Sequence, residues 1–117
     1  NKNVVYNSDS NIMQELSAHT GMDSVVIIFS MSGSTPELIS VAEKASMMGA
    51  KIIAITCAPA ELPINRMAHI RIKGYCHHNR TFTRVDVTSR LPLYVISRIL
   101  MDYLMLQYQQ EEARNRK

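Results

Sequence analysis

A cluster of small hydroxyl side chains between residues 30 and 35 is the part of the sequence best suited to ligand chemistry. Ser30, Ser32, Ser34 and Thr35 place four hydroxyl groups within six positions, and Gly33 lets the backbone turn among them. Hydroxyl groups beside free backbone N–H groups at the start of a helix attract a phosphate group. The spacing therefore predicts an anion-binding loop.

The elements on either side of this loop predict where it lies in the fold. Residues 25–29 form a continuous apolar run, which predicts a strand buried on both faces of a parallel sheet. Thr35 suits the N-cap of a helix, and Pro36 suits its first position. The loop would then lie at the carboxyl end of a strand, where open α/β sheets bind their ligands.

Any anion in this loop would be held by neutral donors, because residues 30–35 contain no Lys or Arg. The P-loop pattern GxxxxGK[ST] is also absent from the sequence, which favours a modest, exchangeable ligand over a nucleoside triphosphate. The alternative, an ordinary loop that binds no ligand, stays open. Serine and glycine are common after a strand, and threonine is common at an N-cap.

The sequence offers no catalytic residue set, so we expect that the chain is not an enzyme. Glu37 could act as a base beside the loop, but the helix dipole alone favours a carboxylate in a first turn. No histidine has a carboxylate at a suggestive spacing. Cys57 and Cys76 lack the spacing of zinc ligands, so we expect no metal site and no cofactor.

Composition indicates one small globular domain. The chain has 117 residues, of which 46% are hydrophobic and 20% charged, with a net charge of +3. Three basic residues lie in the last four positions, so the remainder is nearly neutral and does not indicate a nucleic-acid surface. We expect no signal peptide, and no apolar run approaches the roughly 18 residues of a membrane span. With two cysteines read as free thiols, we expect a cytoplasmic protein without membrane contact.

Hydrophobic periodicity predicts the other elements of the first 73 residues. The expected strands cover residues 3–6, 51–56 and 69–72, and the expected helices cover residues 11–19, 36–48 and, as one short turn, 64–67. Ser10 is the expected cap of the first helix and Gly49 the expected end of the second. Two βα units in succession predict a parallel sheet with right-handed crossovers.

The last third of the chain divides into an irregular segment and one long helix. Residues 74–86 have no regular pattern, which favours an irregular loop over a lid or a partner surface. A helix is expected over residues 87–114, capped by Thr88 or Ser89, with Pro92 in its first turn. Its apolar residues exceed one stripe, and two interpretations stay open. Either one wide face packs on the sheet, or Ile96, Leu100, Tyr103 and Leu104 cover the sheet while Leu93, Met101 and Met105 meet a second subunit.

Two separated motifs resemble a known family. Residues 30–56 read SMSGSTPELISVAEKASMMGAKIIAIT, which resembles the sugar isomerase (SIS) domain, with its S-x-S-G-x-T loop, a helix closing in G-A and a strand ending in I-T. Residues 88–106 read TSRLPLYVISRILMDYLML, which is similar to the end of RpiR-type transcriptional regulators. The resemblance covers nearly the whole chain, from Val4 to Leu106, and two separated motifs in the right order make it fairly specific.

This resemblance implies a fold and a ligand. The implied fold is α/β, a three-layer doubly wound parallel sheet of the flavodoxin or Rossmann-like type with flanking helices. In the family, the loop hydroxyls and neighbouring amides hold the phosphate of a sugar, and the last helix often faces the same pocket. The residues that the resemblance assigns to the sugar phosphate are Ser30, Ser32, Gly33, Ser34, Thr35 and Ser89.

The chain departs from the family pattern at its start. A complete SIS domain begins with a strand, a G-x-G-x-S loop and a helix, and we expect residues 1–117 to be an SIS domain that lacks this first strand. The strand lies near the middle of the family's usual sheet, so its absence would leave a gap or require a replacement. The helix-turn-helix domain that precedes the SIS domain in RpiR-type regulators is also expected to be absent.

The leading functional hypothesis is a phosphosugar-binding sensor domain of a bacterial RpiR-type regulator of carbohydrate metabolism. It implies a sugar phosphate effector, a homodimer or higher homo-oligomer formed through helices, and DNA contact only through the absent helix-turn-helix domain. The alternatives are a phosphosugar isomerase, which would need an acid and a base near the sugar carbons, and a fragment that serves only for dimerisation.

Overall fold

The computed structural model describes residues 3–75 and 90–116 of the chain. The chain divides into two compact units, Asn1–Lys73 and Gly74–Lys117, and each is considered by itself. The first unit holds a sheet with its helices, and the second holds one long helix.

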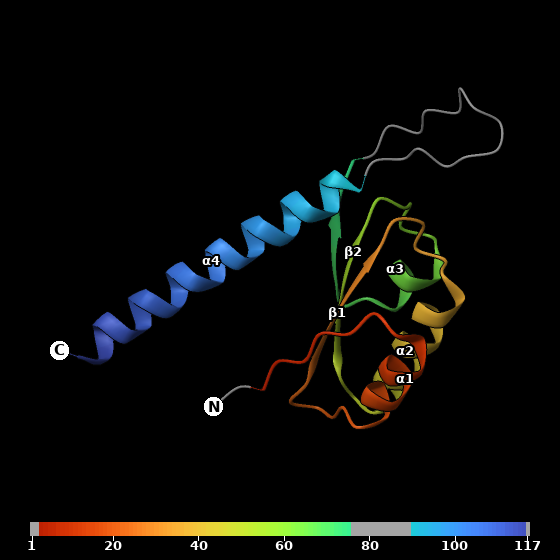
Figure 1. Ribbon diagram of the computed structural model, residues 1–117, viewed down its shortest axis with the longest axis horizontal. Helices are drawn as coiled ribbons and strands as arrows, with labels where there is room; N and C mark the ends of the chain where they lie inside the picture. Colours follow the sequence, from red (N-terminus) through yellow and green to blue (C-terminus); the bar gives the residue numbers. More distant parts are fainter. Residues whose placement is uncertain (1–2, 76–89, 117) are drawn as a thin grey trace. The chain divides into compact units, whose positions relative to one another are not determined.

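The first unit is built on a parallel sheet of β1 (Val25–Ser30), β2 (Lys51–Thr56) and β3 (Ile70–Lys73), in the order β1-β2-β3 (Figure 1). The register aligns the last residues of the three strands, Ser30 with Thr56 and Thr56 with Lys73. The loops after all three strands therefore leave from one edge of the sheet. The predicted α/β class, a parallel sheet with flanking helices, is confirmed.

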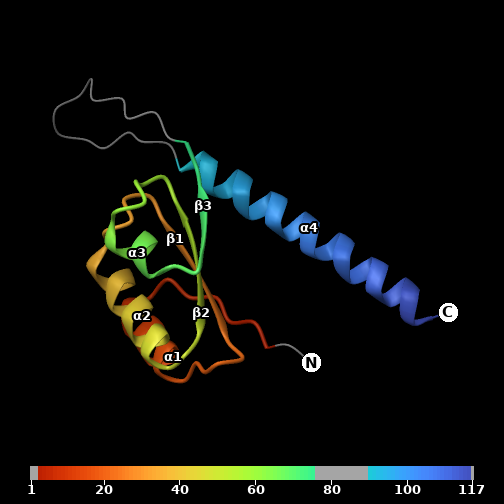
Figure 2. The same cartoon turned by 180° about the vertical axis from the view of Figure 1, so that it is seen from behind.

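Three helices accompany this sheet: α1 (Ser10–Ala18), α2 (Pro36–Met47) and α3 (Pro63–Met67). Both views of the ribbon place them on the same side of the sheet, with α1 beside α2 (Figures 1 and 2). The core forms where α2 and α3 meet the strands. It consists of Ile28, Ala42, Ile52, Ala54 and Ile64, which are all buried. Alanines on both sides of this contact allow the close packing of helix on sheet.

The opposite face of β1 is exposed, which corrects the prediction that this strand is buried on both faces. Val25 is 58% exposed, and Ile27 and Phe29 are each 42% exposed. The reason is that α2 and α3 pack on the other face, and that β1 is an edge strand of the described sheet. For β2, in the middle of the sheet, the prediction fits better, since Ile52 and Ile55 on its two faces are fully buried.

The strand predicted at residues 3–6 is wrong. The structure has no strand there, and Val4 and Tyr6 are 88% and 86% exposed. An apolar β-branched run favours a strand only when a neighbouring strand accepts its hydrogen bonds, and none of the described strands pairs with this segment.

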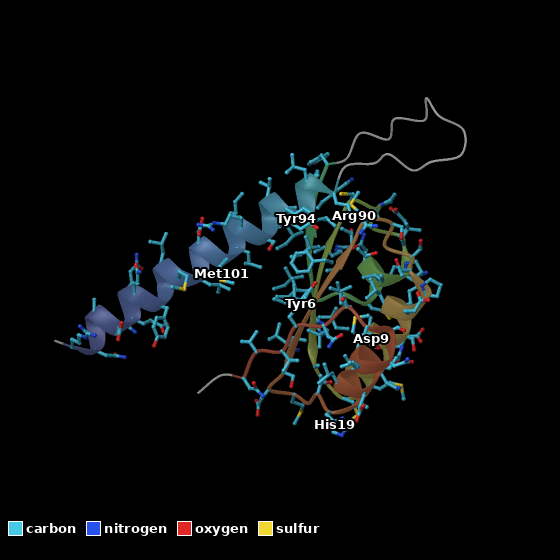
Figure 3. All side chains as sticks on the ribbon, in the orientation of Figure 1. Tyr6, Asp9, His19, Arg90, Tyr94 and Met101 are labelled. Carbon is cyan, nitrogen blue, oxygen red and sulfur yellow. The ribbon has the colours of Figure 1, made fainter. Side chains whose placement is uncertain are left out.

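The cap of α1 differs from the prediction by one residue. Asp9, not Ser10, is the N-cap, and its Oδ1 accepts hydrogen bonds from the backbone N–H groups of Asn11 at 2.9 Å and Ile12 at 3.1 Å (Figure 3). A carboxylate at this position also interacts favourably with the helix dipole. At the start of α2 the prediction holds, since Thr35 is the N-cap and Pro36 begins the helix. At its end the C-cap is Met48 and not the predicted Gly49, which follows it with φ +85°.

The second unit contains α4 (Leu91–Asn115), a helix of 25 residues. It begins after Arg90, and the predicted caps Thr88 and Ser89 lie outside the described residues. Exposed ion pairs one turn apart join Arg98 to Asp102 at 3.1 Å and Arg116 to Glu112 at 3.2 Å. None of the helices in the described part of the chain is long and apolar enough to span a membrane.

The predicted division of the apolar residues of α4 between a sheet and a second subunit stays a prediction. Leu93, assigned to the subunit contact, is the only buried residue of the helix as described. Tyr103 and Leu104, assigned to the sheet, are 58% and 52% exposed. Periodicity did not assign one face, because residues 91–106 of the helix are apolar on several sides.

Candidate functional site

The predicted hydroxyl loop connects the end of β1 to the start of α2, at the edge of the sheet where the loops leave the strands. Gly33 turns the chain with φ +64°, a conformation that favours glycine. Its backbone N–H donates to Ser30 Oγ at 3.1 Å, and Ser30 is only 4% exposed. Ser30 therefore shapes the loop from inside, while the exposed positions 32 and 34 face solvent.

The hydroxyl groups of Ser32 and Thr35 lie together at the surface of the loop. Thr35 Oγ1 is 3.4 Å from Ser32 Oγ and 3.5 Å from Ser30 Oγ, and the Ser34 N–H donates to Ser32 Oγ at 3.3 Å. Thr35 occupies the N-cap of α2, but its side chain makes no capping hydrogen bond. The hydroxyl that would normally satisfy a first-turn amide is thus turned toward the other loop hydroxyls.

This arrangement leaves donors available at the start of α2. Pro36 has no N–H, and the N–H of Ile39 already donates to the Thr35 carbonyl at 3.0 Å. The N–H groups of Glu37 and Leu38 find no acceptor among the described residues. Two free amides at the positive end of a helix of 12 residues, beside three hydroxyl groups, can bind a phosphate group without a cationic side chain.

The loop is held from behind by the segment that leads into α3. The N–H of Ile64 donates to the Gly33 carbonyl at 3.2 Å. A Cβ atom at position 33 would lie 2.8 Å from Ala58 Cβ, closer than real contacts allow. Gly33 is therefore required both for its backbone conformation and for this close approach.

A buried amide, which the sequence analysis did not identify, fixes that supporting segment. Asn65 Oδ1 accepts from Thr56 Oγ1 at 3.0 Å, and its Nδ2 donates to the carbonyls of Ala58 at 3.2 Å and Pro59 at 2.8 Å. Thr56 and Asn65 are 2% and 4% exposed. The only sequence signal was a polar residue in a short apolar helical turn, which does not reveal what the amide bonds.

The structure brings five of the six predicted site residues together, Ser30, Ser32, Gly33, Ser34 and Thr35. Ser89 lies outside the described residues. Glu37 is exposed at the edge of the loop, and His69 Nδ1 accepts from the backbone N–H of Ile52 at 3.1 Å, so that ring serves the fold.

The other chemistry-bearing side chains form no metal site in the part of the chain that the structure describes. The prediction of free thiols is wrong for Cys57, which is disulfide-bonded. The other cysteine of the sequence, Cys76, lies outside the described residues.

Comparison with known proteins shows the family of the chain. Residues 1–96 match the family model described as "SIS domain". A crystal structure of a hypothetical protein superposes with a TM-score of 0.65 at 15% identity, over 83% of this chain and 62% of that one. This likeness shows the fold alone, and the chain spans less than two thirds of that relative.

Two further structures are each named a "putative phosphosugar isomerase". The protein from Salmonella typhimurium has a TM-score of 0.55 at 23% identity, over 67% of this chain and 23% of its own. The protein from Bacillus subtilis has a TM-score of 0.49 at 33% identity, over 55% of this chain and 19% of its own. This chain therefore spans about a fifth of the length of each.

Proposed function

The chain belongs to the SIS domain family, and on that premise we propose that it binds a sugar phosphate through the hydroxyl loop and acts as a sensor domain. The proposal rests chiefly on one observation. The Thr35 hydroxyl does not cap α2, and the amides of Glu37 and Leu38 have no acceptor among the described residues. A phosphate group would satisfy both amides and receive hydrogen bonds from the Ser32 and Thr35 hydroxyls.

The proposed role of this binding is regulation rather than catalysis. The motif at residues 88–106 resembles the end of RpiR-type regulators, in which the SIS domain senses an effector for a separate DNA-binding domain. Glu37 is the acidic side chain nearest the loop in sequence, and it has no basic partner at the loop within the described residues. Isomerisation would need an acid and a base facing the sugar carbons. We therefore expect ligand binding without turnover.

The proposal includes self-association through α4. Large apolar residues are exposed along the helix, among them Ile99 and Leu106. Tyr94 and Met101 are exposed as well (Figure 3). A helix that is apolar on several faces is stable in water when another surface covers it, and a second copy of α4 is the simplest such surface. Effector binding would then shift a homodimer between two states.

Isothermal titration with a panel of sugar phosphates tests the binding proposal, with inorganic phosphate and the unphosphorylated sugars alongside. Ser32→Ala removes one exposed loop hydroxyl and should weaken binding of a responding ligand about tenfold. Ser40→Ala, which removes a hydroxyl within α2 away from the loop, is the matched control and should leave the affinity unchanged. Equal affinity for a sugar and its phosphate would contradict the proposal, and turnover of a ketose or aldose phosphate would favour an isomerase.

A further inference from the structure

A second feature of the first unit lies beside the hydroxyl loop, on the other side of the α3 segment. It is a cavity of about 190 Å³ at the carboxyl edge of the sheet, with walls from the ends of β2 and β3 and from the segment between them. Ala58 and Asn65 belong to its wall, as do two basic residues, Arg71 and Lys73. The functional site described above does not use this cavity.

The two basic residues share one face of β3. The two residues are two positions apart in the strand, so their side chains lie on the same face. The register pairs Arg71 with Ala54 and Lys73 with Thr56. Ala54 belongs to the core that α2 and α3 cover, so both basic residues lie on the helix side of the sheet. This placement explains why α3 and β3 together enclose a space with positive charge on one wall.

The charged side chains described in the cavity wall are both positive. Among the described residues, its lining includes two cationic side chains and no carboxylate. Arg71 forms no ion pair with any residue in the described ranges. Thr56 and Asn65 line the wall as well, but their hydroxyl and amide hydrogens are already donated within the protein, so the attraction for an anion comes from the basic side chains. A cavity of this composition favours an anion.

The cavity and the hydroxyl loop are neighbours. Gly33 approaches Ala58 and Asn65, which separate the loop from the cavity and belong to the cavity wall. Across the sheet edge, Ser30 pairs with Thr56 and Thr56 pairs with Lys73, so Ser30 and Lys73 are two strand spacings, roughly 10 Å, apart. A phosphorylated sugar with an acidic group at its other end has a length of this order.

We propose that the cavity beside α3 binds an anionic group, a carboxylate or a phosphate, through Arg71 and Lys73. The group comes either from the ligand whose phosphate occupies the hydroxyl loop or from a separate small anion. In the first case the proposal rests on the proposed function and narrows the ligand class to sugar phosphates that carry a second acidic group. The neutral donors of the hydroxyl loop would hold the phosphate, and the side chains of Arg71 and Lys73 would hold the second anionic group.

Isothermal titration of the full chain with 6-phosphogluconate and glucose 6-phosphate tests the first case, because the two probes differ by an acidic group. The wild type should bind 6-phosphogluconate at least about tenfold more tightly, and Arg71→Gln should remove this preference. Arg66→Gln is the matched control, since Arg66 is an exposed basic residue of α3 outside the cavity. Lys73→Gln provides a second test, and the melting temperature of each variant checks its fold.

The separate-anion case is tested with gluconate and inorganic phosphate on Ser32→Ala, in which the hydroxyl loop is weakened. Binding that persists in this variant and falls about tenfold on adding Arg71→Gln supports a separate anion in the cavity. If gluconate binds in this Arg71-dependent way while glucose 6-phosphate does not bind at all, the cavity proposal holds and the hydroxyl-loop function fails. If Arg71→Gln and Lys73→Gln leave the affinity of every probe equal to that of Arg66→Gln, the cavity proposal is overturned.

Discussion

The helices α2 and α4 differ in what covers their apolar residues. The 12 residues of α2 bury Val41, Ala42 and Ala45, while the 25 residues of α4 bury only Leu93 among those described. Packing on the sheet therefore fixes the position of α2, and with it the positions of the free N–H groups of Glu37 and Leu38 at its start. The described part of α4 buries little of its apolar surface, and we propose that a second copy of the helix covers it. In this proposal α2 positions the ligand site and α4 provides the association surface.

The largest expected difference concerns two isoleucines. Ile52→Ala removes a fully buried side chain from the core beneath α2, and should lower the free energy of unfolding by about 2–5 kcal/mol. Ile99→Ala, at a position of α4 that is 63% exposed, should change it by less than about 0.5 kcal/mol in dilute monomeric protein. Urea denaturation measures both values. Equal losses would mean that α4 is covered within one chain.

The second test concerns the loop that α2 supports. Gly33→Ala places a Cβ at φ +64° and 2.8 Å from Ala58 Cβ, which should cost at least about 1–2 kcal/mol of stability and weaken ligand binding. Gly21→Ala is the matched control, because a Cβ there would meet no atom within 4 Å. Thermal unfolding compares the two variants. A Gly33→Ala protein as stable as Gly21→Ala would show that the loop does not have the turn described here.

Self-association gives the third test of the difference between α2 and α4. Ile99→Glu puts a charge on the exposed apolar surface of α4 and should weaken association at least about tenfold, because burying an unpaired charge in an interface is unfavourable. Met47→Glu adds the same charge at a position of α2 that is 86% exposed and should leave association unchanged. Sedimentation velocity over a range of concentrations measures both. A wild-type chain that stays monomeric throughout would exclude α4 as the association surface.

The smallest effect is expected at the helix caps. Asp9→Ala removes the side chain that accepts from two amides of α1 and should cost about 1 kcal/mol. Arg90→Ala, at the N-cap of α4, removes a side chain without a capping hydrogen bond and should cost almost nothing. Urea denaturation measures the free energy of unfolding of both variants. A larger loss of stability in Arg90→Ala than in Asp9→Ala would contradict the assignment of a side-chain cap to α1 and none to α4.

The sequence predicted most of what local physics determines. Continuous apolar runs located β1 and β2, and Thr35 with Pro36 located the start of α2. The hydroxyl loop followed from these boundaries, because a short loop between a strand and a helix has little freedom. The place of these five residues in the fold was therefore predictable from the sequence, while their binding of a ligand stays a proposal.

The errors occurred where an outcome depends on distant partners. Residues 3–6 have the composition of a strand but no described strand beside them, and the exposed face of β1 depends on which helices cover it. Asn65 and Arg71 gave little signal, because their positions at the loop and at the cavity depend on the packing of α3 and the register of β3. Local pattern does not contain this information.

The most direct test of the central claim is an amide NMR titration of the chain with a sugar phosphate and with the same sugar unphosphorylated. A phosphate bound at the hydroxyl loop must change the environment of the free amides of Glu37 and Leu38. We expect these two resonances to shift with glucose 6-phosphate, or with the tightest ligand of the panel, and to stay in place with the unphosphorylated sugar. Binding of the phosphorylated ligand without any shift at Glu37 and Leu38 would contradict the account.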